Sequence, residues 1–213
     1  MLQIKALLLM LFYLFTVSAS AQDKAVKLPP PQKEIGKPLM QVLNLRQSTR
    51  AFSPQTLSMQ DMSNLLWAAF GINRSESGKR TAPSARNWQE IDIYAATAEG
   101  MFLYNAKDHS LIKVSGEDLR ALTGKQDYVK DAPLNLVYIA DMSKTGDSPG
   151  DDRLIYTSAD CGFIAQNVYL YCASEGLGVV VRGMVDRDAL SKKLNLRQDQ
   201  KIILSQTVGY MKK

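Results

Sequence analysis

The chain has 213 residues, of which 46% are hydrophobic and 22% are charged, and its formal net charge is +5. This length and composition predict a globular protein with one domain around a single hydrophobic core. The basic residues are scattered rather than gathered in a stripe with aromatic residues, which argues against a nucleic-acid surface, and the two cysteines and one histidine show no metal-ligand spacing.

The N-terminus has the pattern of a signal peptide over residues 1–21. A lysine precedes an apolar run over 6–17, and Ala19 and Ala21 fit the A-x-A cleavage pattern, so the mature chain is expected to begin at Gln22. The run is too short to span a bilayer comfortably and no other long apolar run follows, so no membrane span is expected after cleavage. The alternative is an uncleaved N-terminal anchor. The prediction is an exported protein, located in the periplasm or outside the cell.

Residues 22–38 are predicted to form a flexible, extended leader, because the stretch is polar and has three prolines at its centre. The folded domain is expected over 39–213, and it begins with a short helix over 39–45. Ser58 is a good N-cap for a second helix, in which apolar residues recur at helical spacing until Gly71 ends it.

The middle of the chain predicts mainly strands. Residues 91–97 alternate between apolar and polar side chains and indicate a strand. The next expected elements are a hairpin of 101–104 with 111–114, a short helix that Ser115 caps and that runs to Leu122, and a strand over 134–140. A loop rich in Gly, Pro and Asp follows, and residues 143–152 are the expected lid of a ligand pocket.

Residues 154–174 form the longest helical stretch, which is apolar on nearly every face and predicts a central buried helix. Cys161 and Cys172 both lie in it. Because eleven residues of helix rise about 16 Å, far beyond the reach of a disulfide, two buried free thiols are expected. The remaining elements are a strand over 179–181, a helix that Asp186 caps and that runs to Leu194, and a strand over 202–210. Helices and strands do not alternate regularly, which predicts an α+β fold around one sheet.

Four segments carry candidate functional residues, and the first two lie in turns. Arg46 and Arg50 stand four residues apart with Ser48 between them, so their donors can converge on one anion. The alternative is a solvated basic turn. In Pro83–Gln89 the small residues let the backbone approach a flat ring, whose polar edge the Asn87 amide can reach. The alternative is a plain turn that leads into the next strand.

The other two segments lie in and after the long helix. Gly162 and Ala165 make a low spot on the helix, against which a ring or another backbone can lie, and Gln166 is a polar group in apolar surroundings. The alternative is helix–helix packing around a satisfied amide. Gly176–Gly178 either stops the helix or offers backbone amides to a ligand. It is not a dinucleotide-binding fingerprint, because no strand precedes it and the third glycine is missing.

Taken in this order, the four segments resemble the nitroreductase family. The family has an Arg-x-Ser-x-Arg-x-Phe segment, as in Arg46–Phe52, and a Pro-Ser-Ala-x-Asn-x-Gln turn, as in Pro83–Gln89. Its long helix carries Gly-x-x-Ala-Gln-Asn, as in Gly162–Asn167, and leaves through Gly-Leu-Gly. A final strand usually ends in Gly-Tyr, seen here as Gly209–Tyr210. The resemblance spans about 39–213.

The resemblance implies an α+β, nitroreductase-like sandwich, with a central mixed or antiparallel sheet flanked by helices and a long buried central helix. It also implies an FMN-dependent oxidoreductase that transfers two electrons, as a hydride, to or from a small organic substrate in a ping-pong scheme. Members are usually homodimers in which both chains contact each FMN. No catalytic side chain is expected, because the flavin carries the chemistry. Cytosolic relatives take electrons from NAD(P)H, and export leaves the donor open here.

Carried over residue by residue, the resemblance implies a set of cofactor contacts. The phosphate and ribityl chain would be held by Arg46, Ser48 and Arg50, with Lys212 or Lys213 also at the phosphate. The ring would be lined by Pro83, Ser84 and Asn87, and Gln166 is included among the cofactor contacts. The backbone near the reactive edge of the flavin would be that of Gly176, Leu177 and Gly178.

The sequence departs from the family pattern in several places. Arg86 brings a cation into the turn, where it suits either the FMN phosphate or an acidic substrate. Gln89 lacks the usual following proline, and Asp160 stands where many members have a glutamate. Only three residues follow Tyr210, so the arm that often wraps the partner subunit is expected to be short or missing. The compact form resembles the branch that includes azoline-oxidising enzymes.

Two other functions are compatible with the same residues. One is an exported protein of this fold that binds flavin or another ligand without turnover. The other is a structural domain whose arginines are surface charges, which predicts a colourless protein.

Overall fold

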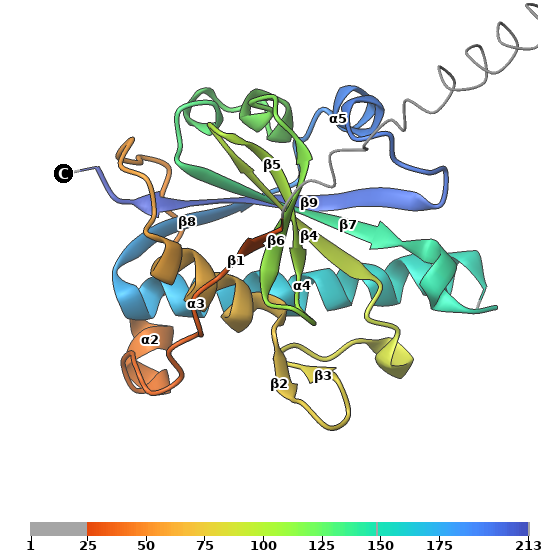
Figure 1. The fold of residues 1–213 in the computed structure, drawn as a ribbon, viewed down its shortest axis with the longest axis horizontal. Coiled ribbons are helices and arrows are strands. Elements are labelled where there is room, and N and C mark those ends of the chain that lie inside the picture. The colour runs from red at the N-terminus through yellow and green to blue at the C-terminus, as the bar shows by residue number, and fades with distance from the viewer. Residues whose placement is uncertain (1–24, 148, 213) are drawn as a thin grey trace, which may run out of the picture.

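A seven-stranded sheet forms the centre of the fold (Figure 1). In this computed structural model residues 25–147 and 149–212 are described, so the predicted signal peptide over 1–21 lies outside the described residues. The strand order is β1-β6-β5-β4-β7-β9-β8, and every pairing between neighbours is antiparallel. The strands are β1 (Val26–Lys27), β4 (Ile91–Thr97), β5 (Gly100–Asn105), β6 (Ser110–Ser115), β7 (Leu134–Asp141), β8 (Leu177–Arg182) and β9 (Gln200–Tyr210).

Helices cover both faces of this sheet, which confirms the predicted α+β sandwich. The α-helices are α2 (Leu39–Leu45), α3 (Met59–Phe70), α4 (Gly150–Glu175) and α5 (Arg187–Lys193). The short 3-10 helices are η1 (Ala85–Asn87), η2 (Arg120–Thr123), η3 (Asp127–Val129) and η4 (Met142–Thr145). Figure 1 shows α3 and α4 on one side of the sheet and α5 on the other, and a separate hydrophobic core fills each side.

Most elements form where the periodicity of the sequence predicts them. Ser58 caps α3 as expected, because its Oγ accepts a hydrogen bond from the Asp61 backbone N–H at 3.0 Å. The strand expected over 91–97 is β4. The long helix begins four residues earlier than predicted, at Gly150, where the acidic residues Asp151 and Asp152 favour the positive end of a helix.

One local expectation was wrong. The helix that Ser115 was expected to cap does not form, because Ser115 ends β6 and its Oγ accepts from the Glu117 N–H at 3.1 Å in a tight turn. Only the short η2 lies in that stretch. Residues 75–78 form the turn of a small hairpin of β2 (Ile72–Arg74) with β3 (Lys79–Arg80), two short strands that the sequence pattern did not indicate.

The long helix α4 crosses beneath the sheet with one face buried and the opposite face exposed. The buried face carries Thr157, Asp160, Cys161, Ile164, Ala165, Val168, Tyr169 and Cys172. The two cysteines are free and buried, as predicted. The opposite face exposes Ile155 and Phe163, with 64% and 48% of their surface accessible in the single chain. The α4 helix therefore has two apolar faces. One is buried against the core of this chain, and the other is exposed in the single chain.

The leader, expected to be flexible, lies against the domain over its described part. Its β1 strand pairs with β6 at the edge of the sheet, and Leu28 is buried. The Ser63 hydroxyl donates to the Pro29 carbonyl at 2.6 Å. Further along, the Gln32 N–H donates to Asn64 Oδ1 at 2.8 Å, so the proline stretch is fastened to α3.

The single histidine supports this attachment. His109 Nε2 lies 2.7 Å from Ser63 Oγ, and Nδ1 lies 3.0 Å from the Tyr104 hydroxyl. Because the Ser63 hydrogen already points at the Pro29 carbonyl, Nε2 must donate to Ser63 and Nδ1 must accept from Tyr104. Burial lowers the pKa of His109, which favours this neutral form. The histidine thus has a structural role in holding the leader.

Candidate functional site

The first motif segment lies along the edge formed by β8 and the end of β9. The Thr49 N–H donates to the Val179 carbonyl at 2.9 Å, and the Ser53 N–H donates to the Tyr210 carbonyl at 2.8 Å. The Lys212 N–H donates to the carbonyl of Ala51 at 3.1 Å. Arg46–Phe52 and Lys212, which about 160 residues of sequence separate, are therefore neighbours.

Tyr169 of α4 positions the start of this segment. Its hydroxyl accepts a hydrogen bond from the Val181 N–H at 2.9 Å and lies 2.9 Å from Ser48 Oγ. The guanidinium of Arg46 lies over the Tyr169 ring, 5.4 Å from its centroid, within the range of a cation–π contact. Nothing in the sequence pattern singled out Tyr169, because it reads as one more large residue on the buried face of a helix.

Arg46, Arg50 and Lys212 form a group of cations at this edge, and we call it the cationic edge. None of the three forms an ion pair with a carboxylate in the described part of the chain. Arg50 and Lys212 are exposed and Arg46 is half-buried. Positive side chains gathered without a carboxylate partner suit an anion, and arginine presents forked donors to phosphate oxygens.

Glycines allow the segment to lie close to β8. A Cβ on Gly178 would come within 3.1 Å of Met211 Cγ and 3.2 Å of both Phe52 Cε1 and Thr49 Cγ2. Gly176 has a φ of 73° and closes α4, with its N–H donating to the Cys172 carbonyl. Of the backbone amides expected to face a ligand, that of Gly176 is thus engaged in the helix end, and Leu177 is buried in β8.

The second motif segment forms a tight turn on η1. The Ala85 N–H donates to Asp160 Oδ2 on α4 at 2.8 Å, and the Gln89 N–H donates to Ser84 Oγ at 3.0 Å. Arg86, Asn87 and Gln89 all have positive φ, at 50°, 57° and 49°. Non-glycine residues in this region are strained, and such strain gathers at functional sites. The turn exposes Pro83 and Asn87, as a ligand contact requires.

A buried pair of carboxyl groups lies beneath this turn. Glu90 is fully buried, and neither of its carboxyl oxygens meets a hydrogen-bond donor among the described residues. Burial raises the pKa of Glu90 to about 7, and the neighbouring Asp160 carboxyl adds to the effect. Burial also raises the pKa of Asp160. An acid and a carboxylate side by side can share one proton.

The two groups of predicted residues lie toward opposite ends of α4 in this chain (Figure 1). Tyr169 holds the cationic edge, and Asp160 holds the turn over Pro83–Gln89. These two residues are nine positions apart, which is about 13 Å along a helix. Gln166 lies between them on the exposed face of α4. One chain therefore carries the predicted cofactor residues in two separate groups.

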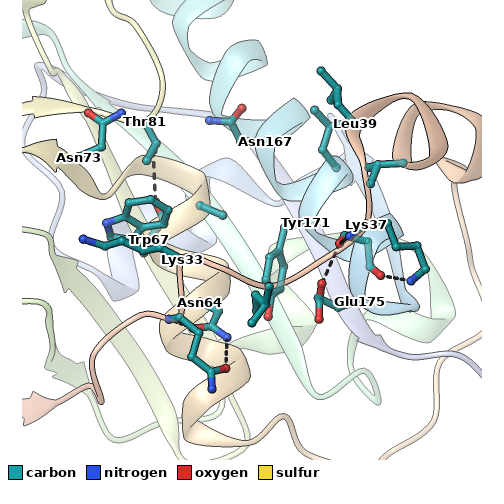
Figure 2. A pocket seen from close by; sticks show the side chains of 16 residues that line it. Lys33, Lys37, Leu39, Asn64, Trp67, Asn73, Thr81, Asn167, Tyr171 and Glu175 are labelled. Atoms are coloured by element: carbon teal, nitrogen blue, oxygen red, sulfur yellow. Dashed lines mark hydrogen bonds between the residues drawn. The ribbon is translucent and has the colours of Figure 1, made fainter.

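A separate cavity of about 420 Å³ lies between the leader, α3 and the C-terminal half of α4. Figure 2 shows its wall formed by Trp67, Tyr171 and Asn64, with Lys33 and Lys37 from the leader. Lys33 Nζ lies 5.3 Å from the centroid of Trp67. None of the predicted cofactor residues lines this cavity. Sequence reasoning missed it because one wall is the leader, whose position depends on contacts far along the chain.

The described residues contain no group of three or more His, Cys, Asp or Glu side chains placed to hold a metal ion. Among the helices of residues 25–147 and 149–212, none is both long and apolar enough to cross a membrane.

Comparison with known proteins gives one consistent family. The sequence model described as "Nitroreductase family" matches residues 43–210. A nitroreductase-family protein of Methanocaldococcus jannaschii is 30% identical over 170 residues, which cover 75% of this chain and 85% of that protein.

Solved structures agree with the sequence comparison. A nitroreductase-family protein from Ralstonia eutropha JMP134 has a TM-score of 0.85 at 43% identity, covering 91% of this chain and 92% of that chain. A chain of the Escherichia coli microcin synthetase McbBCD complex shares the fold, with a TM-score of 0.69 at 18% identity, covering 90% of this chain and 80% of that one. The chain described here belongs to the nitroreductase family of oxidoreductases.

Proposed function

We propose that this protein is an FMN-dependent oxidoreductase that passes two electrons between a donor and a small organic acceptor. The cationic edge carries the proposal, because Arg46, Arg50 and Lys212 have no carboxylate partner in the described residues and match the charge of a phosphate. Bound FMN would supply the hydride chemistry, and donor and acceptor would use it in turn in a ping-pong scheme.

The residues of the chain would bind and orient the cofactor. The arginines and Lys212 would hold the phosphate, and Ser48, fixed by Tyr169, would lie beside the ribityl chain. The strained turn would present Pro83, Ser84 and Asn87 to the ring. No acid or base side chain is needed in this scheme, because the protein acts by orientation and charge.

The separation of the cationic edge from the turn over Pro83–Gln89 in one chain supports a homodimer. If the exposed faces of two α4 helices pair in antiparallel fashion about a two-fold axis, the turn of one protomer meets the cationic edge of the other. The face offers apolar and small residues at helical spacing: Ile155, Ala159, Gly162 and Phe163. Each flavin would then be held by both chains, and Gln166 would lie between them.

A charge at position 163 is expected to break this dimer. Phe163→Asp puts a carboxylate into an apolar contact, where it costs several kcal/mol unless it is paired. We expect a dimer to become a monomer in sedimentation velocity at about 10 μM, with most of the bound flavin lost. Phe163→Leu is the matched control and should remain dimeric. An unchanged dimer in Phe163→Asp, with an unchanged circular dichroism spectrum, would mean that the chains pair through another face.

An absorption spectrum of the purified protein tests the function directly. A flavin spectrum that bleaches with anaerobic dithionite, and then also with NADH or NADPH, is the expected result. Bleaching with dithionite but with no biological donor would favour a flavin-binding protein without turnover. A colourless protein that does not take up added FMN would overturn the proposal.

Export is proposed together with this function. The signal-peptide pattern of the N-terminus supports a protein that works in the periplasm or outside the cell. In that setting NAD(P)H is scarce, and a quinol, a protein or the substrate itself can serve as donor. N-terminal sequencing of protein from the natural host should begin at Gln22, whereas a chain that still starts at Met1 would contradict cleavage.

A further inference from the structure

Arg86 is the one cation of the strained turn Pro83–Gln89, and its side chain is exposed. Hydrogen bonds on either side of it fix its backbone. The Ala85 N–H donates to Asp160 Oδ2, and the Asn87 N–H donates to the Ser84 carbonyl at 3.0 Å. Arg86 is thereby kept at a φ of 50° and is exposed. Its guanidinium meets no carboxylate in residues 25–147 and 149–212.

Two aromatic side chains adjoin this arginine. The guanidinium lies 5.9 Å from the centroid of the Trp88 ring, at the limit of a cation–π contact. Trp88 in turn meets Tyr156 of α4 edge to face, with centroids 6.1 Å apart. Tyr156 is exposed and Trp88 is half-buried. A planar cation and two aromatic rings at 72° to each other thus form one contiguous cluster, which we call the Arg86 shelf.

The position of the shelf decides between the two anions that Arg86 can serve. In the single chain it lies with Asp160, toward the opposite end of α4 from Tyr169 and the cationic edge. Ser84 and Asn87, its immediate neighbours, are the residues proposed to line the flavin ring. In the proposed dimer each flavin lies between this turn and the partner's cationic edge. Arg86 then stands at the ring end, beside Ser84 and Asn87, and the phosphate falls to the arginines of the cationic edge, Arg46 and Arg50.

We infer that the Arg86 shelf selects planar acceptors that carry a negative charge, such as aromatic carboxylates. The guanidinium fork pairs with a carboxylate, and the exposed Tyr156 ring offers an apolar surface against which the planar body can lie. This inference rests on the proposed flavin function, since it assigns the substrate class of the same site.

A matched pair of ligands tests the inference. Nitrobenzene and 4-nitrobenzoate share the ring and the nitro group and differ by one carboxylate. Their binding to the FMN-loaded protein is measured by calorimetry, which needs no turnover. We expect 4-nitrobenzoate to bind about ten-fold more tightly than nitrobenzene, as one exposed charge-assisted contact provides.

Substitutions at position 86 identify the source of that preference. Arg86→Asn removes the charge and keeps a side chain that tolerates positive φ, so the ten-fold preference should disappear. Arg86→Lys keeps the charge without the fork and should retain part of it. Lys130→Asn, which removes an exposed cation elsewhere, is the control and should leave the preference unchanged. A preference that survives in Arg86→Asn, or that Lys130→Asn abolishes equally, would overturn the inference.

The two proposals fail in different ways. If the protein binds FMN and prefers 4-nitrobenzoate but reduces neither compound with any donor, the shelf stands and the oxidoreductase function falls. If both compounds are reduced with equal KM and bind equally well, the function stands and the inference on Arg86 is wrong. If the protein takes up no FMN and binds the two compounds equally, both the oxidoreductase function and the inference on Arg86 are wrong.

Discussion

Replacing Arg46 and Arg50 together by alanine is expected to lower the affinity for FMN by about two to four orders of magnitude. Each charge-assisted hydrogen bond to a phosphate contributes about 1.5–3 kcal/mol, and 1.4 kcal/mol is ten-fold in affinity. The two arginines face no carboxylate in the described residues, so their charges are free to act on a ligand. The measurement is a titration of apoprotein with FMN, followed by quenching of flavin fluorescence.

Riboflavin provides the control for this result, because it has the same ring and ribityl chain without the phosphate. The double variant should bind riboflavin as the unchanged protein does. A second control replaces the exposed Lys107 and Lys192 by alanine, which removes the same charge from the turn between β5 and β6 and from α5. If FMN and riboflavin lose affinity equally, the arginines act through the fold, for example through the contact of Arg46 with Tyr169, and do not hold a phosphate.

Glu90→Gln is expected to change how stability depends on pH. The folded protein keeps a proton on Glu90 up to a pKa of about 7, whereas an ordinary glutamate releases it near 4.5. Between these values the folded state binds more protons than the unfolded state, so stability falls as pH rises, and the loss is complete above pH 7. This difference corresponds to about 3 kcal/mol. The variant should show a smaller fall, because only the raised pKa of Asp160 then contributes to it, and it should be the more stable protein at pH 8.

The measurement is urea unfolding of both proteins at pH 5 and pH 8. Glu99→Gln is the matched control, because Glu99 is an exposed glutamate at the turn between β4 and β5, and its replacement should leave the pH dependence unchanged. If the free energy of unfolding changes equally between pH 5 and pH 8 in Glu90→Gln and in the unchanged protein, Glu90 is ionised in the fold. Water or a cation would then satisfy its charge.

The elements that the sequence predicted well are those with a strong local signal. The α3 helix carries its own cap and period, β4 alternates, and β7 is a largely apolar run between turns, so their limits depend on near neighbours. The Ser115 error has the opposite origin. Serine suits a helix cap and a tight turn equally, and the pairing of β6 with β5 decided for the turn.

The candidate site was predicted as a set of residues but not as an arrangement. The order of the motifs along the chain does not predict which part of α4 each segment contacts. Single hydrogen bonds to Tyr169 and to Asp160 fix those positions. The sequence did offer one unused signal, since Glu90 is a carboxylate directly before a run of buried strand residues. A charge in that position indicates either a buried partner or a function.

The attachment of the leader bears on how the chain folds. Val26 of β1 pairs with Leu111 of β6, 85 positions later. The ribosome therefore makes β1 well before β6, the strand whose edge it covers. Contacts of such long sequence separation form late, and until then β6 presents open hydrogen-bonding groups to any other chain. A molecule that lacks β1, or that carries a bulky tag just before it, would keep most of both cores and still be prone to aggregate through that edge.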